Sequence, residues 1–284
     1  MILGIDASNI RGGGTVNHLV ELLRAADPPA HCFSRVIVWS GLATLNRIED
    51  RPWLIKSHHP PLDKSLFHRS MWQRCQLSRQ ARMSNCDVLF VPGGSFAGNF
   101  RPMLTMSQNL LPFDWHELRR FGWSWMTVKL TMLRIINTRT FRRADGCIFL
   151  TRCARDVIMK VIKRTAGRTT IIPLGVGKRF VCPPREQLAI HHYSNDRPFR
   201  ILYVSTVDMY KHQWQVADAV GQLRREGMPV VLDLIVPAYA PAMKRLRQTM
   251  ERVNTSGECV RYIGAVSHHT LDARYAQADL CVFA

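Results

Sequence analysis

A lysine stands where an apolar segment meets a helical pattern. The segment RILYVS, residues 200–205, runs into a short polar turn, and Lys211 then opens the stretch KHQWQVADAVGQLRREG. A helix N-terminus already carries partial positive charge and free N–H groups, so a cation is locally unfavourable there. The cation becomes favourable when the helix entrance holds a strongly anionic group such as a phosphate. The alternative is an exposed lysine on a solvated helix.

Three consecutive glycines form a second candidate, within DASNIRGGGTVNHLVELL. Gly12, Gly13 and Gly14 make a loop whose backbone can approach a ligand closely. Thr15 is placed to cap the following helix, whose N–H groups face the same gap. The dinucleotide fingerprint G-x-G-x-x-G is not met, because Asn17 occupies the place of the third glycine. A plain tight turn explains the three glycines equally well.

The segments that would position these candidates alternate along the chain. Short apolar runs such as RVIVWS and DVLFV are followed by helix-like patterns, as far as TTIIPLGV at residues 169–176. We predict one long helical region over residues 115–143. Alternation of strand and helix predicts a parallel sheet covered by helices on both faces.

The alternation stops at residues 174–198, a segment rich in Pro and His without a helical period. We interpret this segment as a linker between an N-terminal domain, residues 1–173, and a C-terminal domain, residues 199–284. The second domain resumes the alternation from RILYVS to LCVFA. In the doubly wound strand order 3-2-1-4-5-6, LCVFA is the fourth strand and should lie beside RILYVS. The predicted fold class is α/β, with two Rossmann-like doubly wound domains of which the second is incomplete.

The net charge of +18 is the strongest signal in the composition. Such a charge implies an anionic partner, which can be nucleic acid, anionic lipid or a phosphorylated substrate. Nucleic acid ranks below the others, since the sequence has no helix-turn-helix, zinc-finger or aromatic RNA-binding motif. No run reaches the roughly 18 apolar residues of a membrane span, and MILGIDASN does not resemble a signal peptide. We therefore expect a cytoplasmic protein.

The eight cysteines are scattered without a C-x-x-C pair. Several lie in strand-like runs, such as Cys147 in DGCIFL and Cys281 in DLCVFA. This usage is typical of buried free thiols in a reducing compartment. We predict neither a disulfide framework nor a metal site.

The predicted helical region at residues 115–143 is aromatic and basic. It contains Trp115, Phe121, Trp123 and Trp125, and its cations are Arg119, Arg120, Lys129, Arg134, Arg139, Arg142 and Arg143. Aromatic rings beside cations suit the headgroup layer of an anionic membrane. Two alternatives stay open: a core helix whose aromatic rings pack inward while its arginines stay solvated, and a nucleic-acid surface.

Several stretches together resemble the family 4 glycosyltransferases of the GT-B fold. They are the GGG loop, TMSQNLLPFD, RRADGCIFLTRCARD, IIPLGVGKRF, ILYVSTVDMYKHQWQVADAV and VRYIGAVSHHTLDARYAQADLCVFA, in an order and spacing similar to that family over the whole chain. The resemblance implies a nucleotide-sugar donor, transfer with retention and neither metal nor cofactor. It implies that the C-terminal domain holds most of the donor and the N-terminal domain the acceptor.

The resemblance also assigns roles to single residues. Lys211 would contact the donor diphosphate as a point charge. Gly13 and Gly14 would approach the donor phosphates or the acceptor. The residues that would line the nucleotide base are Ile263, Gly264 and Val266, for which ordinary packing at a strand end is the alternative.

The sequence departs from the family pattern at two places. Thr206 stands where the family commonly has an arginine, so one phosphate contact would be missing or supplied elsewhere. Gln108, followed by Asn109, stands where a histidine is often found near the sugar. An amide can hydrogen-bond a hydroxyl but cannot act as a base near pH 7, and a loop amide that satisfies backbone groups is the alternative for Gln108.

The family's glutamate pair, E-x7-E, should follow ADLCVFA, and the 284 residues end first. We therefore expect a glycosyltransferase sequence cut short in its second domain, and both an active and an inactive chain stay open. It would act on a polysaccharide or lipid-linked acceptor at the inner face of a membrane. The alternatives are a non-catalytic remnant that binds membrane or nucleotide, and a basic nucleic-acid-binding protein.

Overall fold

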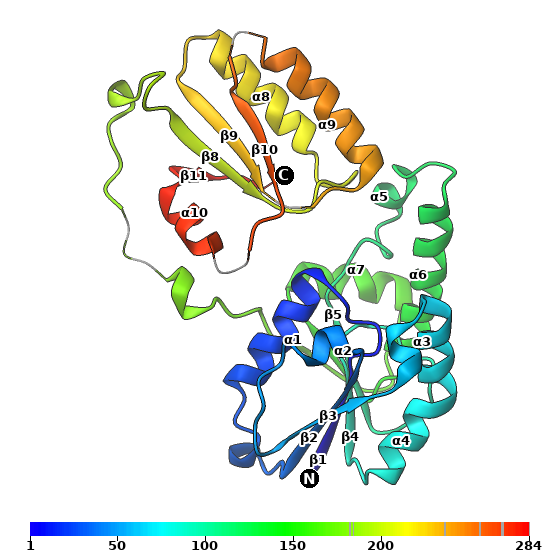
Figure 1. The fold of residues 1–284 in the computed structure, drawn as a ribbon. Coiled ribbons are helices and arrows are strands. Elements are labelled where there is room, and N and C mark those ends of the chain that lie inside the picture. Colours follow the sequence, from blue (N-terminus) through cyan, green and yellow to red (C-terminus); the bar gives the residue numbers. More distant parts are fainter. Residues whose placement is uncertain (182, 184, 236, 256, 268–269, 284) are drawn as a thin grey trace. The chain divides into compact units, whose positions relative to one another are not determined.

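The computed structural model describes residues 1–181, 183, 185–235, 237–255, 257–267 and 270–283. The chain divides into two compact units, unit 1 at Met1–Gly175 and unit 2 at Val176–Ala284. Each unit is an α/β layer structure built on its own parallel sheet (Figure 1).

Unit 1 contains, within the described residues, a seven-stranded sheet in the order β3-β2-β1-β4-β5-β6-β7. All neighbouring strands are parallel. The strands are β1 (Ile2–Asp6), β2 (Arg35–Ser40), β3 (Leu54–His58), β4 (Val88–Val91), β5 (Met103–Ser107), β6 (Gly146–Phe149) and β7 (Arg168–Ile171). This is the doubly wound arrangement that the alternation predicted.

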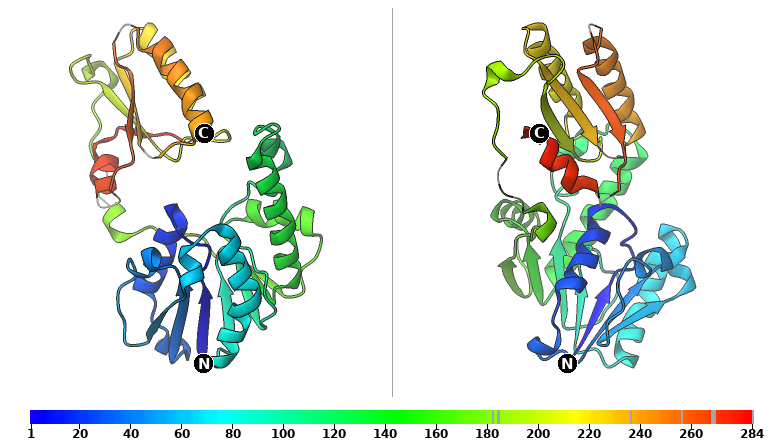
Figure 2. Two further views of the ribbon diagram at one scale, coloured as in Figure 1. Left: turned by 45° about the vertical axis from the view of Figure 1, so that its right-hand side comes forward. Right: turned by 60° about the vertical axis from the view of Figure 1, so that its left-hand side comes forward.

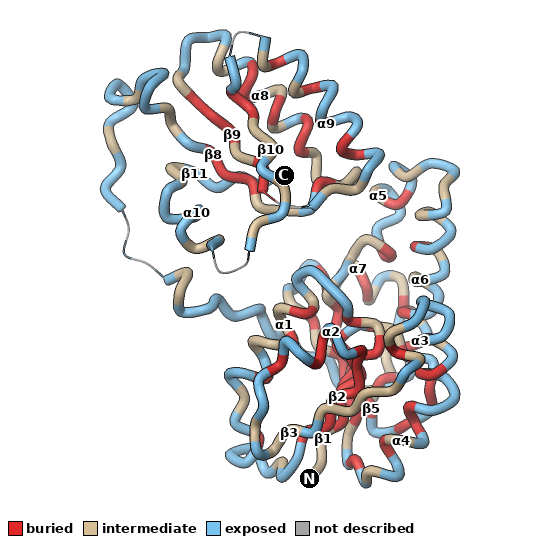
Figure 3. The backbone as a smooth tube through the Cα atoms, in the orientation of Figure 1, coloured by how far each residue is buried: buried red, intermediate tan, exposed pale blue. Residues whose placement is uncertain are grey.

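Helices cover both faces of this sheet (Figure 2). They are α1 (Gly13–Ala25), α2 (Leu42–Leu45), α3 (Leu66–Trp72), α4 (Ser78–Met83), α5 (Trp115–Arg119), α6 (Trp125–Arg143) and α7 (Arg152–Ile162). Successive residues of a strand point to opposite faces, and in β2 Val38 joins the core beneath α1 while Trp39 joins the core beneath α4, α6 and α7. Figure 3 shows the buried strands in red.

The helical region predicted for residues 115–143 consists of two helices, α5 and α6, with a break between them. Asp114 caps α5 by accepting from the N–H groups of His116 and Glu117, and Ser124 caps α6 by accepting from Thr127 N. Between the two helices Gly122 takes φ +58°, which only glycine adopts without strain. Two cap signals and a glycine therefore divide the region.

Unit 2 contains, within its described part, a four-stranded parallel sheet in the order β10-β9-β8-β11. The strands are β8 (Phe199–Val204), β9 (Val230–Ile235), β10 (Val260–Gly264) and β11 (Leu280–Cys281). Leu280 pairs with Ile201 and Cys281 with Leu202. The prediction that LCVFA lies beside RILYVS is confirmed.

Three helices flank the sheet of unit 2 within the described residues: α8 (Gln213–Arg225), α9 (Ala240–Val253) and α10 (Leu271–Gln277). Helices α8 and α9 lie together on one face, and α10 lies on the other (Figure 1 and Figure 2). A right-handed crossover requires this, because β8 to β10 run one way across the sheet and β11 returns to the other side of β8.

The segment interpreted as the linker has only 3-10 turns among its described residues, at Lys178–Phe180 and Ile190–His192. Asp279 fixes this segment to unit 2. Its carboxylate accepts from Arg185 Nη2 at 2.6 Å and from the Tyr193 hydroxyl at 3.0 Å, and also from Arg200 N at 2.8 Å.

The seven described cysteines are free, and Cys182 lies outside the described residues. Three of the seven, Cys86, Cys147 and Cys259, are buried as expected. The other four are exposed, against expectation: Cys32, Cys75, Cys153 and Cys281. Cys281 is exposed because β11 is a two-residue strand at the edge of its sheet.

Candidate functional site

In doubly wound sheets, ligands bind outside the carboxyl ends of the strands, where the strand order reverses. In unit 2 the order reverses between β8 and β11, because α8, which follows β8, and α10, which precedes β11, lie on opposite faces. Lys211 follows β8 and Phe283 follows β11, so both residues lie at this reversal.

Lys211 is half-buried among aromatic rings. Its Nζ lies 4.2 Å from the ring centroid of Phe283 and 4.9 Å from that of Tyr210. The Tyr203 hydroxyl donates to the Lys211 carbonyl at 2.5 Å, which fixes the turn. Burial lowers the pKa of the Lys211 ammonium, while the nearby Asp208 carboxylate acts in the opposite direction. Lys211 therefore differs from the alternative, a fully exposed lysine on a solvated helix.

Helix α8 begins at Gln213, two residues later than the predicted entrance. His212 occupies the N-cap with φ +52°, and among the described residues no side chain caps the helix and no acidic residue lies in its first turn. Gln215 N already donates to the His212 carbonyl at 2.9 Å, so the first N–H groups of the helix, at Gln213 and Trp214, are the ones left for a ligand or water. The Gln213 side chain, 0 % exposed, turns inward and donates from Nε2 to the Thr206 carbonyl at 2.9 Å.

The other residues of unit 2 that were assigned to the donor lie at the same edge of this sheet. Thr206 is exposed and presents its carbonyl to Gln213, so it supplies no positive charge. Gly264 ends β10 with φ +82°, and a Cβ built there would meet no described atom within 4 Å. Ile263 is 37 % exposed and Val266 is half-buried. Ile263, Gly264 and Val266 are at or after the end of β10, which is two strands away from β8, roughly 10 Å at the usual strand spacing.

The three glycines predicted as a loop in unit 1 lie where the connection from the carboxyl end of β1 enters α1: Gly12 is the N-cap residue, and Gly13 and Gly14 are the first two residues of the helix. Gly12, Gly13 and Gly14 are exposed, and a Cβ built on any of them would meet no described atom within 4 Å. Within the described residues α1 has no side-chain cap and no acidic first turn. Thr15, predicted as the cap, instead donates from its hydroxyl to the Gly12 carbonyl at 2.9 Å. The loop is open on its outer side.

A buried polar network lies at the carboxyl end of β1, and its partners could not be recognised from the sequence. Asp6, 3 % exposed, accepts from Ser8 N at 3.1 Å and from Gln73 Nε2 at 2.5 Å. Burial raises the pKa of the Asp6 carboxyl, and the hydrogen bonds from Ser8 and Gln73 partly oppose this. Gln73 also donates to the Ser95 carbonyl at 3.0 Å and begins the π-helical turn Gln73–Leu77. Such turns often mark functional sites.

Gln108 directly follows β5 and is half-buried at the same carboxyl edge. Its Nε2 is buried without a hydrogen-bond partner among the described residues. A buried donor without a partner is costly unless a ligand or water completes it. The adjacent Asn109 is exposed and accepts from Leu111 N at 3.0 Å, which shapes the turn. Of this pair, Gln108 has an unused polar group and Asn109 has a structural role.

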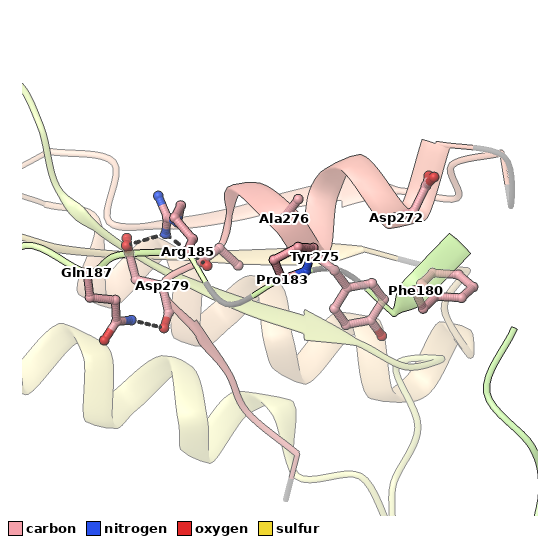
Figure 4. Close-up of a pocket in the computed structure, with 9 residues that line it drawn as sticks. Phe180, Pro183, Arg185, Gln187, Asp272, Tyr275, Ala276 and Asp279 are labelled. Carbon is pink, nitrogen blue, oxygen red and sulfur yellow. Dashed lines mark hydrogen bonds and ion pairs between the residues drawn. The ribbon is translucent and has the colours of Figure 1, made fainter. Parts of the chain in front are cut away.

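A cavity of about 470 Å³ lies between the linker segment and α10 (Figure 4). Its walls include Arg185, Gln187, Tyr275 and Asp279. Arg185 is already paired with Asp279, and Gln187 donates to the Asp279 carbonyl at 2.5 Å. Asp279 precedes β11, so these polar groups lie at the amino edge of the sheet. The cavity is thus separate from the carboxyl edge that carries Lys211.

The exposed face of α6 changes character along the helix. Trp125, Val128, Met132 and Ile135 are all exposed and form the α6 stripe, since their spacing of three and four residues places them on one side. Trp123, just before the helix, is fully exposed at 108 % of its reference area. The final turns carry the exposed arginines Arg139, Arg142 and Arg143.

Two of the basic residues near this surface have structural roles. Arg142 Nε donates to the Ile162 carbonyl at 2.9 Å. Arg134 Nη1 donates to the carbonyls of Pro112 and Phe113.

In the part of the chain that the structure describes, no helix is both long and apolar enough to cross a bilayer, and no cluster of His, Cys, Asp or Glu could hold a metal ion.

The fold is GT-B, with α/β units built on parallel sheets like those of known glycosyltransferases. Sucrose-phosphate synthase from Thermosynechococcus elongatus matches with a TM-score of 0.69 at 17% identity, over 99% of this chain and 74% of that chain. HepE from Anabaena in complex with UDP-glucose matches with a TM-score of 0.64 at 16% identity, over 99% and 73% of the two chains.

A third structure, the lipopolysaccharide outer core galactosyltransferase WaaB in its apo form, matches with a TM-score of 0.56 at 14% identity, over 99% of this chain and 73% of that chain. No protein-family model matches the sequence, and no curated protein matches it. At these identities the likeness establishes the fold.

Proposed function

We propose that this protein is a retaining, family 4-type glycosyltransferase that moves a sugar from a nucleotide-sugar donor to a polysaccharide or lipid-linked acceptor. The observation that carries the proposal is Lys211, a half-buried cation beside the uncapped N-terminus of α8, at the strand reversal of unit 2. HepE, which has the same fold, was crystallised in complex with UDP-glucose, a nucleotide-sugar.

In this proposal the donor diphosphate lies against the first turn of α8 and Lys211. Transfer breaks the bond between the anomeric carbon and the β-phosphate oxygen. The acceptor hydroxyl oxygen forms the new bond to the anomeric carbon, and its proton passes to an oxygen of the leaving diphosphate. Negative charge therefore builds up on the leaving diphosphate. A fixed ammonium and free helix N–H groups stabilise that charge without reorganising. The open backbone at Gly264, beside Ile263 and Val266, would receive the base.

The donor side needs no metal in this proposal, because Lys211 and the helix terminus supply the positive charge. Thr206 contributes no cation, so Lys211 would carry more of the phosphate interaction than in a site with two basic residues. From unit 1, Gln108 would offer its unpartnered N–H to a sugar oxygen. The glycines at 13 and 14 would leave room for the substrate.

We further propose that the enzyme works at an anionic membrane surface, such as the cytoplasmic leaflet. The support is the α6 stripe together with Trp123 and the arginines of the final turns of α6. Docking there would bring a lipid-linked acceptor to unit 1.

Calorimetric titration of the full chain with UDP and with uridine, and with GDP and guanosine, tests the donor site. Lys211→Ala should weaken binding of the matching diphosphate by about 10- to 100-fold, the range for a hydrogen bond to a charged group, and leave nucleoside binding nearly unchanged. Lys244→Ala removes an exposed lysine on α9 and serves as the control. Equal losses for diphosphate and nucleoside, or no binding of either diphosphate, would refute the proposed site.

A further inference from the structure

Arg69, in α3, is a half-buried cation that forms no ion pair or side-chain hydrogen bond with any described residue. Its Nε is buried and has no partner among them. Arginine is always charged and is seldom buried unless it is paired. A guanidinium withdrawn from water without a counter-ion is destabilising, and a bound anion removes that cost.

The location of Arg69 can be deduced from Gln73, which lies one helical turn later in the sequence. Residues four apart on a helix lie on the same side, and Gln73 reaches Asp6 at the end of β1 with a hydrogen bond of 2.5 Å. Arg69 therefore lies over the carboxyl end of β1. Arg11, from the loop after β1, extends toward the same helix and donates from Nη1 to the Lys64 carbonyl at 3.1 Å.

The charges around this point do not cancel. Burial lowers the pKa of the Arg69 guanidinium, and the like charge of Arg11 lowers it further. The two carboxylates on the neighbouring segments are already engaged. Asp63 accepts from His58 Nε2 at 2.6 Å and from Leu42 N at 2.9 Å, and Asp6 accepts from Ser8 N and Gln73 Nε2. Arg11 and Arg69 therefore act on each other as like charges, and Arg69 has no ion pair with a described carboxylate.

Polar groups suited to hydroxyls lie at the same edge. Asn9 Oδ1, in the loop after β1, and Gln108 Nε2, after β5, are both buried without hydrogen-bond partners among the described residues. One is an acceptor and the other a donor, and a hydroxyl uses both kinds of group. β1 and β5 are separated by β4, so the two groups are roughly two strand spacings, about 10 Å, apart. The exposed glycine loop adjoins this region.

We propose that unit 1 binds the acceptor as a phosphate-bearing sugar, with the phosphate between Arg11 and Arg69 and the sugar hydroxyls toward Asn9 and Gln108. The assignment rests on the proposed function, and it narrows the acceptor to one with a phosphate close to its sugar. That phosphate can belong to a soluble sugar phosphate or to a lipid-linked sugar, and both present the same anion to the two arginines.

Titration of the full chain with glucose 6-phosphate, glucose and farnesyl diphosphate tests this site. At least one phosphate probe should bind, and glucose much more weakly. Arg69→Gln should weaken that binding by about 10- to 100-fold, while Arg69→Lys, which keeps the charge, should retain part of it. Preference for glucose 6-phosphate would indicate a soluble acceptor, and preference for farnesyl diphosphate a lipid-linked one.

Arg74→Gln is the matched control, since Arg74 lies on the same helical segment and is exposed. Phosphate binding that is equally affected by Arg69→Gln and Arg74→Gln, or absent for both probes, would overturn the proposal. Thermal unfolding distinguishes a binding role of Arg69 from a structural one. If Arg69 only binds the phosphate, Arg69→Gln should not lower the melting temperature, because it removes a cation that has no counter-ion.

The donor site provides an independent reference. Lys211→Ala should leave binding of the phosphate probe unchanged, and Arg69→Gln should leave UDP and GDP binding unchanged. If Arg69→Gln weakens nucleoside diphosphate binding as much as Lys211→Ala does, the phosphate at Arg69 belongs to the donor and the acceptor assignment fails. If Lys211→Ala leaves UDP and GDP binding unchanged while Arg69→Gln still weakens binding of the phosphate probe, the donor proposal is refuted and the Arg69 site is supported.

Discussion

Removing the tryptophans beside and within α6 should weaken membrane binding more than removing its terminal arginines. Trp123 is 108 % exposed and Trp125 is 77 % exposed, so neither ring contributes to the core. Trp123→Ala/Trp125→Ala should therefore leave the fold intact. For the charge variant we choose Arg139→Gln/Arg143→Gln and leave Arg142, because Arg142 binds the Ile162 carbonyl.

The expected sizes follow from the exposed surface and from the charges. A tryptophan buries about 150–250 Å² when fully covered. Covering about 100 Å² of each ring in the headgroup layer, at about 25 cal/mol per Å², gives roughly 2.5 kcal/mol per ring. Two rings then correspond to about 5 kcal/mol, a loss of roughly 4000-fold in partitioning. Two arginines at about 1 kcal/mol each correspond to a loss of about 30-fold.

Cosedimentation with vesicles of phosphatidylglycerol mixed with phosphatidylcholine measures both losses. High salt should remove the arginine contribution and leave most of the tryptophan contribution, because only the charges are screened. Arg74→Gln/Arg247→Gln removes two exposed arginines from other surfaces as the control. If both α6 variants sediment like the wild-type protein, or if the control loses as much as the arginine variant, α6 is not the docking surface.

Two further predictions concern stability. The amides of β11 should exchange with solvent far faster than those of β4, because Leu280 and Cys281 are exposed at the edge of their sheet whereas β4 lies between β1 and β5; hydrogen exchange showing equal protection of both strands would contradict this. Because burial raises the pKa of Asp6 above its ordinary value of 3.8, the folded protein holds this proton more tightly than the unfolded chain. The free energy of unfolding should accordingly fall as pH rises from that value through the higher pKa of the folded state. Denaturant titrations should show a flatter pH dependence for Asp6→Asn, and an unchanged slope would mean that Asp6 does not titrate in this range.

Local patterns in the sequence were enough for most of the fold. Most strands are short apolar runs and most helices have an apolar face, and these features depend on neighbouring residues only. The doubly wound order then placed LCVFA beside RILYVS, and β11 pairs with β8 as expected. Lys211 could be singled out because its position between a strand and a helix is visible in the sequence itself. The break at Gly122 was missed, although the caps Asp114 and Ser124 were present in the sequence.

The tertiary structure alone decided which polar groups are left without partners. Asp6 and Gln73 are 67 residues apart and meet because the helices after β3 cross over β1 on the way to β4. The same crossing brings Arg69 over the loop that carries Arg11, and no spacing in the sequence encodes that approach. Burial was also decided by packing: Leu130 and Trp125 both belong to α6, yet Leu130 is buried while Trp125 is exposed. A cation becomes a candidate site when packing withdraws it from water, and an aromatic ring becomes one when packing leaves it exposed. Burial is a property of the packed elements rather than of the residue type.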